Sequence, residues 1–154
     1  MSNGVLQVCM SFLGALGFSV LFNVRGLKLF LAALGGAMSW SIFLLMEPLG
    51  SSEPLRYFVS AFAIAVYAEI FARVLKTPAT TFLIPSLIPH IPGGSLYHTM
   101  RYGLDRQWSA CLSQAFYTLK LAMALALGII AVLSLLGVVN VILNKLWLRK
   151  FQFK

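Results

Sequence analysis

Apolar residues run through the chain in long blocks, and the blocks predict helices that cross a membrane. Crossing about 30 Å of hydrocarbon takes about 20 residues of helix. The expected spans are residues 5–22, 28–46, 57–75, 80–100 and 112–137. Short stretches rich in glycine, proline and charge separate them. We therefore expect an all-α polytopic membrane protein of about five transmembrane helices, forming one transmembrane domain over residues 1–154.

The fourth span is interrupted by three prolines and two glycines: Pro85, Pro89, Pro92, Gly93 and Gly94. Proline has no amide hydrogen, so it leaves helix carbonyls without partners. Lipid cannot supply those partners, and an interrupted apolar segment is therefore a pointer to a transporter's binding site. We expect the fourth span to be broken here. The alternatives are a kinked packing helix and a re-entrant hairpin, which would move the C-terminus across the membrane.

A helix that restarts at Gly93–Ser95 would present N-terminal amides that suit a carboxylate. We expect the glycines to let the backbone turn sharply and approach a ligand. Ser95 is also a candidate N-cap that would compete for the same amides. His90 is a candidate proton carrier because histidine titrates near neutral pH, although a single histidine in a loop is more often only hydrogen-bonded.

Composition supports a membrane protein and makes other classes improbable. Hydrophobic residues make up 60% of the chain and charged residues 10%, against about a quarter charged in soluble domains. The net charge of +8 does not indicate binding to nucleic acid, because basic residues that flank membrane spans account for the charge. No basic region precedes the first apolar stretch, so we expect that stretch to remain as a span and not to be removed as a signal peptide. Cys9 and Cys111 are expected to be two buried thiols, with a bridge between them as the alternative.

The distribution of lysine and arginine predicts the orientation of the chain. With the N-terminus outside, the inner segments hold eight basic residues: Arg25, Lys28, Arg73, Lys76, Lys145, Arg149, Lys150 and Lys154. The outer loops then hold three, namely Arg56, Arg101 and Arg106. The excess favours an outer N-terminus and a cytoplasmic C-terminus. Residues 144–154, where cations alternate with large apolar side chains, are expected to form a basic cytoplasmic tail at the headgroup level.

Two polar residues of the third span are candidates for ion coupling. Ionisable groups inside a membrane are costly and often functional. Glu69 and Arg73 lie four residues apart on one helix face, a spacing that suits an ion pair. A structural pair is the favoured interpretation because Arg73 lies near the cytoplasmic end, and a coupling site is the alternative.

The fifth and first spans carry further polar candidates. Gln114, Tyr117 and Lys120 recur at three-residue steps and predict a polar line on one face. This line is one wall of a polar path in the first interpretation. In the alternative, Lys120 extends its side chain to the outer membrane interface and takes no part in a path. Asn23, at the inner end of the first span, either ends that helix or contributes to the path.

Small residues at helical spacing predict close helix packing. Ala61, Ala65, Ala68 and Ala72 form one stripe on the third span, and small residues let helix backbones approach in lipid. Packing within this chain is favoured over an oligomeric interface. Five short helices would leave a cramped path for a substrate, so we also expect a partner subunit.

Two motifs of the chain resemble the threonine/serine exporter (ThrE) family, especially its small YjjB-like subunits. One motif is Gly17–Val24 (GFSVLFNV) and the other is Ile88–Met100 (IPHIPGGSLYHTM). The more specific part is Pro-x-x-Pro-Gly-x-x-x-Tyr-x-x-Met, formed here by Pro89, Pro92, Gly93, Tyr97 and Met100. The length and the spacing of the spans agree with the family over nearly the whole chain.

The resemblance implies export of small hydrophilic carboxylates across the bacterial inner membrane, driven by an ion gradient. Threonine, serine and dicarboxylates such as succinate are the implied substrates. It also implies that this chain is half a transporter and pairs with a larger YjjP-like subunit, a homo-oligomer being the alternative. Candidate substrate-binding residues are Pro89, Pro92, Gly93, Gly94, Ser95 and Tyr97; the family supports neither Gly94 nor His90, which occupy variable positions.

Two other classes of function compete with a transporter. An enzyme is not expected, because the sequence shows no nucleophile with a base, no metal-binding constellation and no phosphate loop. No cofactor is expected either. A structural or assembly subunit that transports nothing itself stays open as the alternative.

Overall fold

The computed structural model describes the backbone of residues 2–152 and the side chains of residues 3–139. The elements are α1 (Ser2–Leu21), α2 (Leu27–Leu45), α3 (Glu53–Val74), α4 (Thr80–Leu87), the 3₁₀ helix η1 (Ile88–His90), α5 (Gly93–Leu104) and α6 (Trp108–Gln152). Four helices in this part of the chain are long and apolar enough to cross a membrane: α1, α2, α3 and α6. The expected all-α polytopic membrane protein is confirmed.

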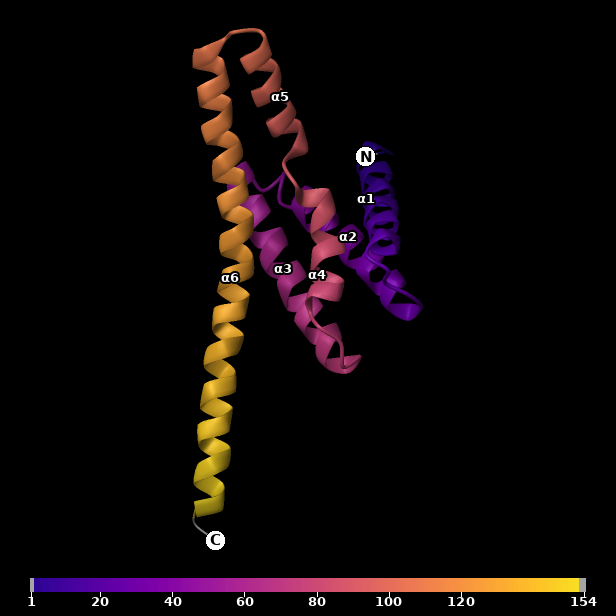
Figure 1. Ribbon diagram of the computed structural model, residues 1–154, viewed down its shortest axis with the longest axis vertical. Helices are drawn as coiled ribbons and strands as arrows, with labels where there is room; N and C mark the ends of the chain where they lie inside the picture. Colours follow the sequence, from indigo (N-terminus) through magenta and orange to yellow (C-terminus); the bar gives the residue numbers. More distant parts are fainter. Residues whose placement is uncertain (1, 153–154) are drawn as a thin grey trace.

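Helices α1 to α4 form a bundle, and α5 with the first part of α6 forms a hairpin that rises beyond it (Figure 1). Helix α2 packs against α1, α3 and α4. Helix α6 runs along α3, and α5 folds back along α6. The segment expected as one broken span is therefore divided between two places, since α4 and η1 lie in the bundle while α5 lies in the hairpin.

Three neighbouring helices bind α2 by donating hydroxyl hydrogens to its carbonyl groups. Ser11 of α1 bonds Gly36, Tyr67 of α3 bonds Leu31, and Ser86 of α4 bonds Ala32, each at 2.8 Å between the oxygens. Hydrogen bonds between helices contribute to association in lipid, where apolar burial gives little drive. Helix α2 is thus the element around which the bundle is assembled.

Small residues let α3 and α6 approach closely. The stripe Ala61, Ala65, Ala68 and Ala72 is buried, as the sequence predicts. Gly128 of α6 lies against Ala61 at one end of this stripe, and a Cβ at position 128 would be 2.5 Å from the carbonyl oxygen of Phe58. The contact is too close for any side chain at position 128.

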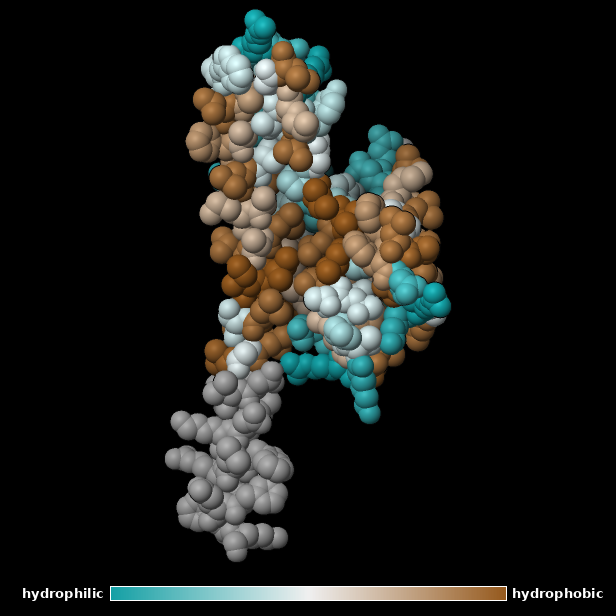
Figure 2. All heavy atoms as spheres, in the orientation of Figure 1, coloured by the Kyte–Doolittle hydropathy of each residue, from teal (hydrophilic) through white to brown (hydrophobic). Residues whose placement is uncertain are grey.

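The surface of the molecule matches a lipid surrounding. Figure 2 shows hydrophobic residues over most of the visible face, and hydrophilic residues gather at the tip of the α5–α6 hairpin and along the lower edge of the bundle. Exposed side chains such as Leu21, Leu45, Ile70 and Leu112 belong to this apolar surface. The side chains of the predicted basic tail, residues 144–154, lie outside the described residues.

The cysteines differ from the expectation of two buried thiols. Both are free, but Cys9 is exposed and Cys111 is half-buried. Helix α1 buries the face that carries Ser11, Ala15 and Ser19, and Cys9 lies two residues from that face, on the opposite side of the helix. Because α1 is apolar on all sides, its sequence does not indicate which face meets lipid.

We expect Gly128→Ala to destabilise the protein by about 1–3 kcal/mol, because the new methyl group must push α3 and α6 apart. Gly137→Ala is the matched control, since a Cβ there meets no atom within 4 Å; it should stabilise α6 by up to about 1 kcal/mol. Thermal unfolding in detergent, followed by circular dichroism, measures both. Equal changes in stability for the two substitutions would contradict the close approach of α3 and α6 at Gly128.

Candidate functional site

The helix break is made by Ile91 and Pro92. Ile91 is extended, with φ −63° and ψ 123°, and Pro92 has φ −72° and ψ 56° immediately before α5. Gly93 and Gly94 are helical, and the φ of neither lies in the left-handed region. The expectation that these glycines make the turn is therefore wrong, because the two preceding residues make it.

Pro85 does not interrupt α4, contrary to its expected part in the break. The helix continues from Thr80 through Pro85 to Leu87, and Pro85 is buried. A proline inside a helix removes one backbone hydrogen bond, and its ring crowds the carbonyl four residues earlier. Pro85 therefore has no amide hydrogen to give the carbonyl oxygen of Thr81, which is left without its usual helical partner.

Ser95 connects α5 to α6 and does not cap α5. The N-cap is Pro92, and no side chain caps the helix. Instead the Ser95 hydroxyl accepts a hydrogen bond from Nε2 of Gln114 at 2.8 Å, and Oγ1 of Thr118 lies 2.9 Å away. Thr99 adds a hydroxyl 3.3 Å from that of Thr118. Two candidate residues from separate predicted spans, Ser95 and Gln114, thus meet in one polar cluster.

The other candidates near the start of α5 face outward. A Cβ at Gly93 or Gly94 would meet no atom within 4 Å, and the Tyr97 side chain is 61% exposed. Pro89 lies elsewhere, at a small cavity between α1 and α2 that Trp40 also lines. The beginning of α5 is therefore open on the side that does not face α6.

His90 is a core residue. Its side chain is fully buried, and the rings of Trp40, Phe43 and Tyr57 lie 5.4, 5.9 and 6.1 Å from it. Nδ1 lies 3.2 Å from the Ser39 hydroxyl. That hydroxyl donates to a carbonyl of its own helix at 2.8 Å, so Nδ1 carries the hydrogen. Nε2 has no partner among the described residues. The aromatic rings leave a substrate no access, and His90 holds η1 against α2.

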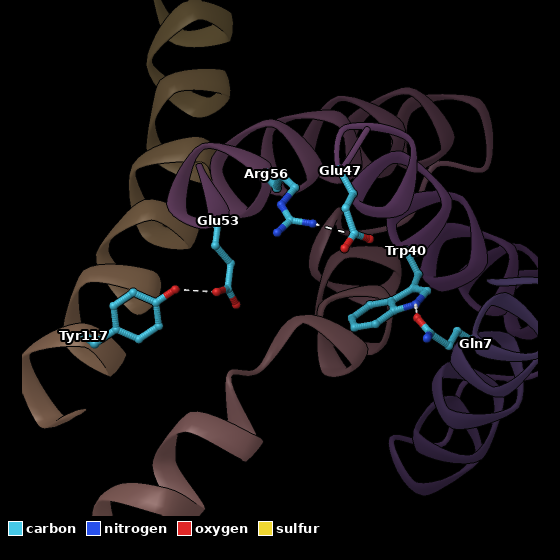
Figure 3. A network of polar contacts seen from close by, with 6 residues as sticks. All are labelled: Gln7, Trp40, Glu47, Glu53, Arg56 and Tyr117. Carbon is cyan, nitrogen blue, oxygen red and sulfur yellow. Dashed lines mark hydrogen bonds and ion pairs between the residues drawn. The ribbon is translucent and has the colours of Figure 1, made fainter. Parts of the chain in front are cut away.

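The polar line expected on α6 is divided between different surroundings. Figure 3 shows Tyr117 donating its hydroxyl hydrogen to the Glu53 carboxylate at the start of α3. In the same region Arg56 lies 3.7 Å from Glu47. Lys120 instead borders an apolar cavity with Phe116 and neighbouring residues. These residues therefore form no continuous path with Gln114.

Glu69 and Arg73 lie close to each other, as their spacing predicts. Nε of Arg73 is 3.9 Å from a Glu69 carboxylate oxygen. The Arg73 side chain is more than half exposed, and the carboxylate is less exposed. The described α6 residues beside the pair, Val132 and Leu136, are apolar. The distance is at the limit of an ion pair, so the contribution to stability is small.

A basic cavity of about 510 Å³ lies at the opposite end of the bundle from the α5–α6 hairpin. The α1–α2 turn and the start of α4 form it, and its polar lining comprises Asn23, Arg25, Lys28, Thr77, Thr80 and Thr81. Asn23 ends α1 in the left-handed region, with φ 58°, and its Oδ1 accepts a hydrogen bond from Nε of Arg25 at 2.9 Å. The turn thus directs both side chains to the cavity.

The sequence marks Asn23 as a residue that ends the first span or lines a polar path, but it does not place Asn23, the basic residues or the threonines at a common cavity. Arg25 and Lys28 were informative only as orientation signals. The threonines lie after the end of the third predicted span. They are far in sequence from the turn between the first two spans, so the sequence does not indicate that the two segments meet. Two threonines at the start of a broken apolar segment are the one local sign that could have drawn attention to the site.

We expect Ser39→Ala to cost about 1–3 kcal/mol of stability, because it leaves Nδ1 of the buried His90 without a partner. Ser41→Ala is the control in the same helix: its hydroxyl bonds only the Ala37 carbonyl, and its removal should change stability by less than about 0.5 kcal/mol. Thermal unfolding in detergent measures the difference. If the two variants unfold at the same temperature, Ser39 does not anchor His90.

A family of known proteins matches the chain. The family described as "Threonine/Serine exporter, ThrE" matches residues 7–135, which cover α1 to α5 and most of the apolar part of α6. No curated protein and no solved structure matches the chain. The match covers well over half of the chain and includes both motifs that carry the resemblance. The chain therefore belongs to the threonine/serine exporter family, a family of transporters, and is a membrane subunit of such an exporter.

Proposed function

We propose that the chain is one subunit of a secondary exporter that moves small hydrophilic carboxylates out of the bacterial cytoplasm. Threonine and serine are the first candidates, and dicarboxylates such as succinate are the second. The observation that carries the proposal is the interruption of α4, η1 and α5 inside an otherwise apolar fold. The transporter lies in the inner membrane with its N-terminus outside and its C-terminus in the cytoplasm.

The start of α5 is the proposed outer substrate site. No side chain caps its first amides, and partial positive charge at a helix N-terminus suits a carboxylate. Ser95, with Gln114 and Thr118 beside it, supplies hydroxyl and amide groups. Tyr97 is exposed one turn from the break.

The openness of this site supports a partner subunit. No residue of α5 is buried, and α6 covers one side of it only. Large apolar side chains on the hairpin are exposed, among them Leu96, Met100, Trp108 and Phe116. A larger YjjP-like subunit that covers the hairpin would enclose the site, and a second copy of this chain is the alternative partner.

We expect Gly93→Leu to abolish threonine export by the co-expressed pair without disturbing assembly. A Cβ at position 93 meets no atom of the described residues within 4 Å, so the leucine side chain would extend into the space proposed for substrate. Gly137→Leu is the matched control, since position 137 is equally open and lies on α6. Efflux of labelled threonine from loaded cells measures both variants. Normal efflux from an assembled Gly93→Leu protein would remove the outer site from the mechanism.

For ion coupling we propose Glu69, which lies in the last two turns of α3 with Arg73 as the charged group beside it. Glu69→Gln should abolish the response of export to an imposed pH gradient while the protein still assembles, because the amide cannot exchange a proton. Asp105→Asn, at the exposed tip of the hairpin, is the control. Efflux at two external pH values tests it; an unchanged pH response would leave Glu69–Arg73 as a structural pair.

A further inference from the structure

The cavity between the α1–α2 turn and α4 has the features of a binding site for a small anion. Its volume of about 510 Å³ lies in the range of small-molecule sites. Two cations, Arg25 and Lys28, line it, and no carboxylate does so among the described residues. The four acidic residues of the chain, Glu47, Glu53, Glu69 and Asp105, all lie elsewhere. The cavity therefore attracts negative charge without any internal compensation.

The cations are held toward the cavity by the local backbone. Asn23 has φ 58° and Gly26 has φ 65°, so two left-handed residues reverse the chain between α1 and α2. The bond from Nε of Arg25 to Oδ1 of Asn23 fixes one edge of the guanidinium. Among the described residues the terminal nitrogens have no other partner, and a guanidinium can bind a carboxylate through two parallel hydrogen bonds.

The opposite wall of the cavity supplies acceptors. Thr81 and Pro85 both line it, and the carbonyl oxygen of Thr81 lacks a helical donor because Pro85 has no amide hydrogen. A free carbonyl and threonine hydroxyls accept hydrogen bonds from an ammonium group. One wall thus suits a carboxylate and the other suits an amine.

We propose that this cavity binds the zwitterionic head of a small α-amino acid, with its carboxylate on Arg25 and Lys28 and its ammonium group on the Thr81 carbonyl. The inference deepens the proposed function and rests on it for direction: the proposed orientation puts the cavity at the cytoplasmic end, where an exporter loads its substrate. It also favours amino acids over dicarboxylates, because a second carboxylate would face the carbonyl oxygen.

The test measures whether amino acids protect a cysteine placed in the cavity. In the full-length chain, Cys9→Ser and Cys111→Ser remove the native thiols, and Thr81→Cys introduces a new one. The protein is placed in nanodiscs of phosphatidylcholine, and its labelling by a maleimide is followed over time. Ser113→Cys, exposed on α6 and remote from the cavity, is the control position.

We expect threonine and serine to slow labelling at position 81 and not at position 113. Threoninol, which lacks the carboxylate, and succinate, which lacks the amine, should have no effect. Lys28→Gln should raise the threonine concentration that gives half protection by about tenfold, the effect of losing one charged hydrogen bond. Lys76→Gln removes the same charge nearby but outside the cavity lining, and it should leave protection unchanged.

Three results would overturn the inference: no protection by threonine, protection that Lys28→Gln leaves unaltered, or protection by succinate equal to that by threonine. A lipid phosphate has related chemistry, so a second series uses nanodiscs with phosphatidylglycerol. If this lipid alone blocks labelling and threonine adds nothing, the cavity is a headgroup site and the inference fails. Protection by threonine in a chain that exports none would keep the cavity as an amino-acid site and reject the proposed export instead.

Discussion

The fold depends on the requirement that backbone and side-chain polar groups find partners within the protein where lipid offers none. Helix α2 meets this requirement for its neighbours, because its carbonyl groups accept hydrogen bonds from Ser11, Tyr67 and Ser86 of three different helices. The close approach needs small residues: a Cβ at Gly36 would lie 2.5 Å from that of Ala15. Hydroxyl donors and small residues together fix where α1, α3 and α4 lie.

The helix break is possible because the same arrangement supports it. Helix α4 is short, and η1 ends at the buried His90, whose ring is fixed by Ser39 and by aromatic neighbours from α2 and α3. Only beyond this anchor does the chain turn at Ile91 and Pro92 and leave the bundle. A residue that looks like a proton carrier in sequence is thus the structural end of the buried segment.

The sequence predicts the helical class, the break and the contact residues of the alanine stripe, because these depend on local composition and on spacing along one helix. It does not predict where two distant segments meet. Ser95 and Gln114 are both chosen as polar residues in apolar surroundings, but their hydrogen bond depends on how α5 folds back on α6. Arg25 and Thr81 share a cavity only because the α1–α2 turn lies beside the start of α4. The glycines after Pro92 mislead, since glycine permits a left-handed turn but does not require one.

The two ends of the interrupted segment differ in a way that fits transport in one direction. At the start of α4 the chain by itself forms a basic cavity with walls from two segments. At the start of α5 it offers polar groups on one side only, and the other side is open. Between them lie Ser86 and His90, both buried and hydrogen-bonded to α2. A substrate therefore cannot pass along α4 while those bonds hold, and the export route that we propose runs beside the segment, along the surface that the proposed partner subunit would cover.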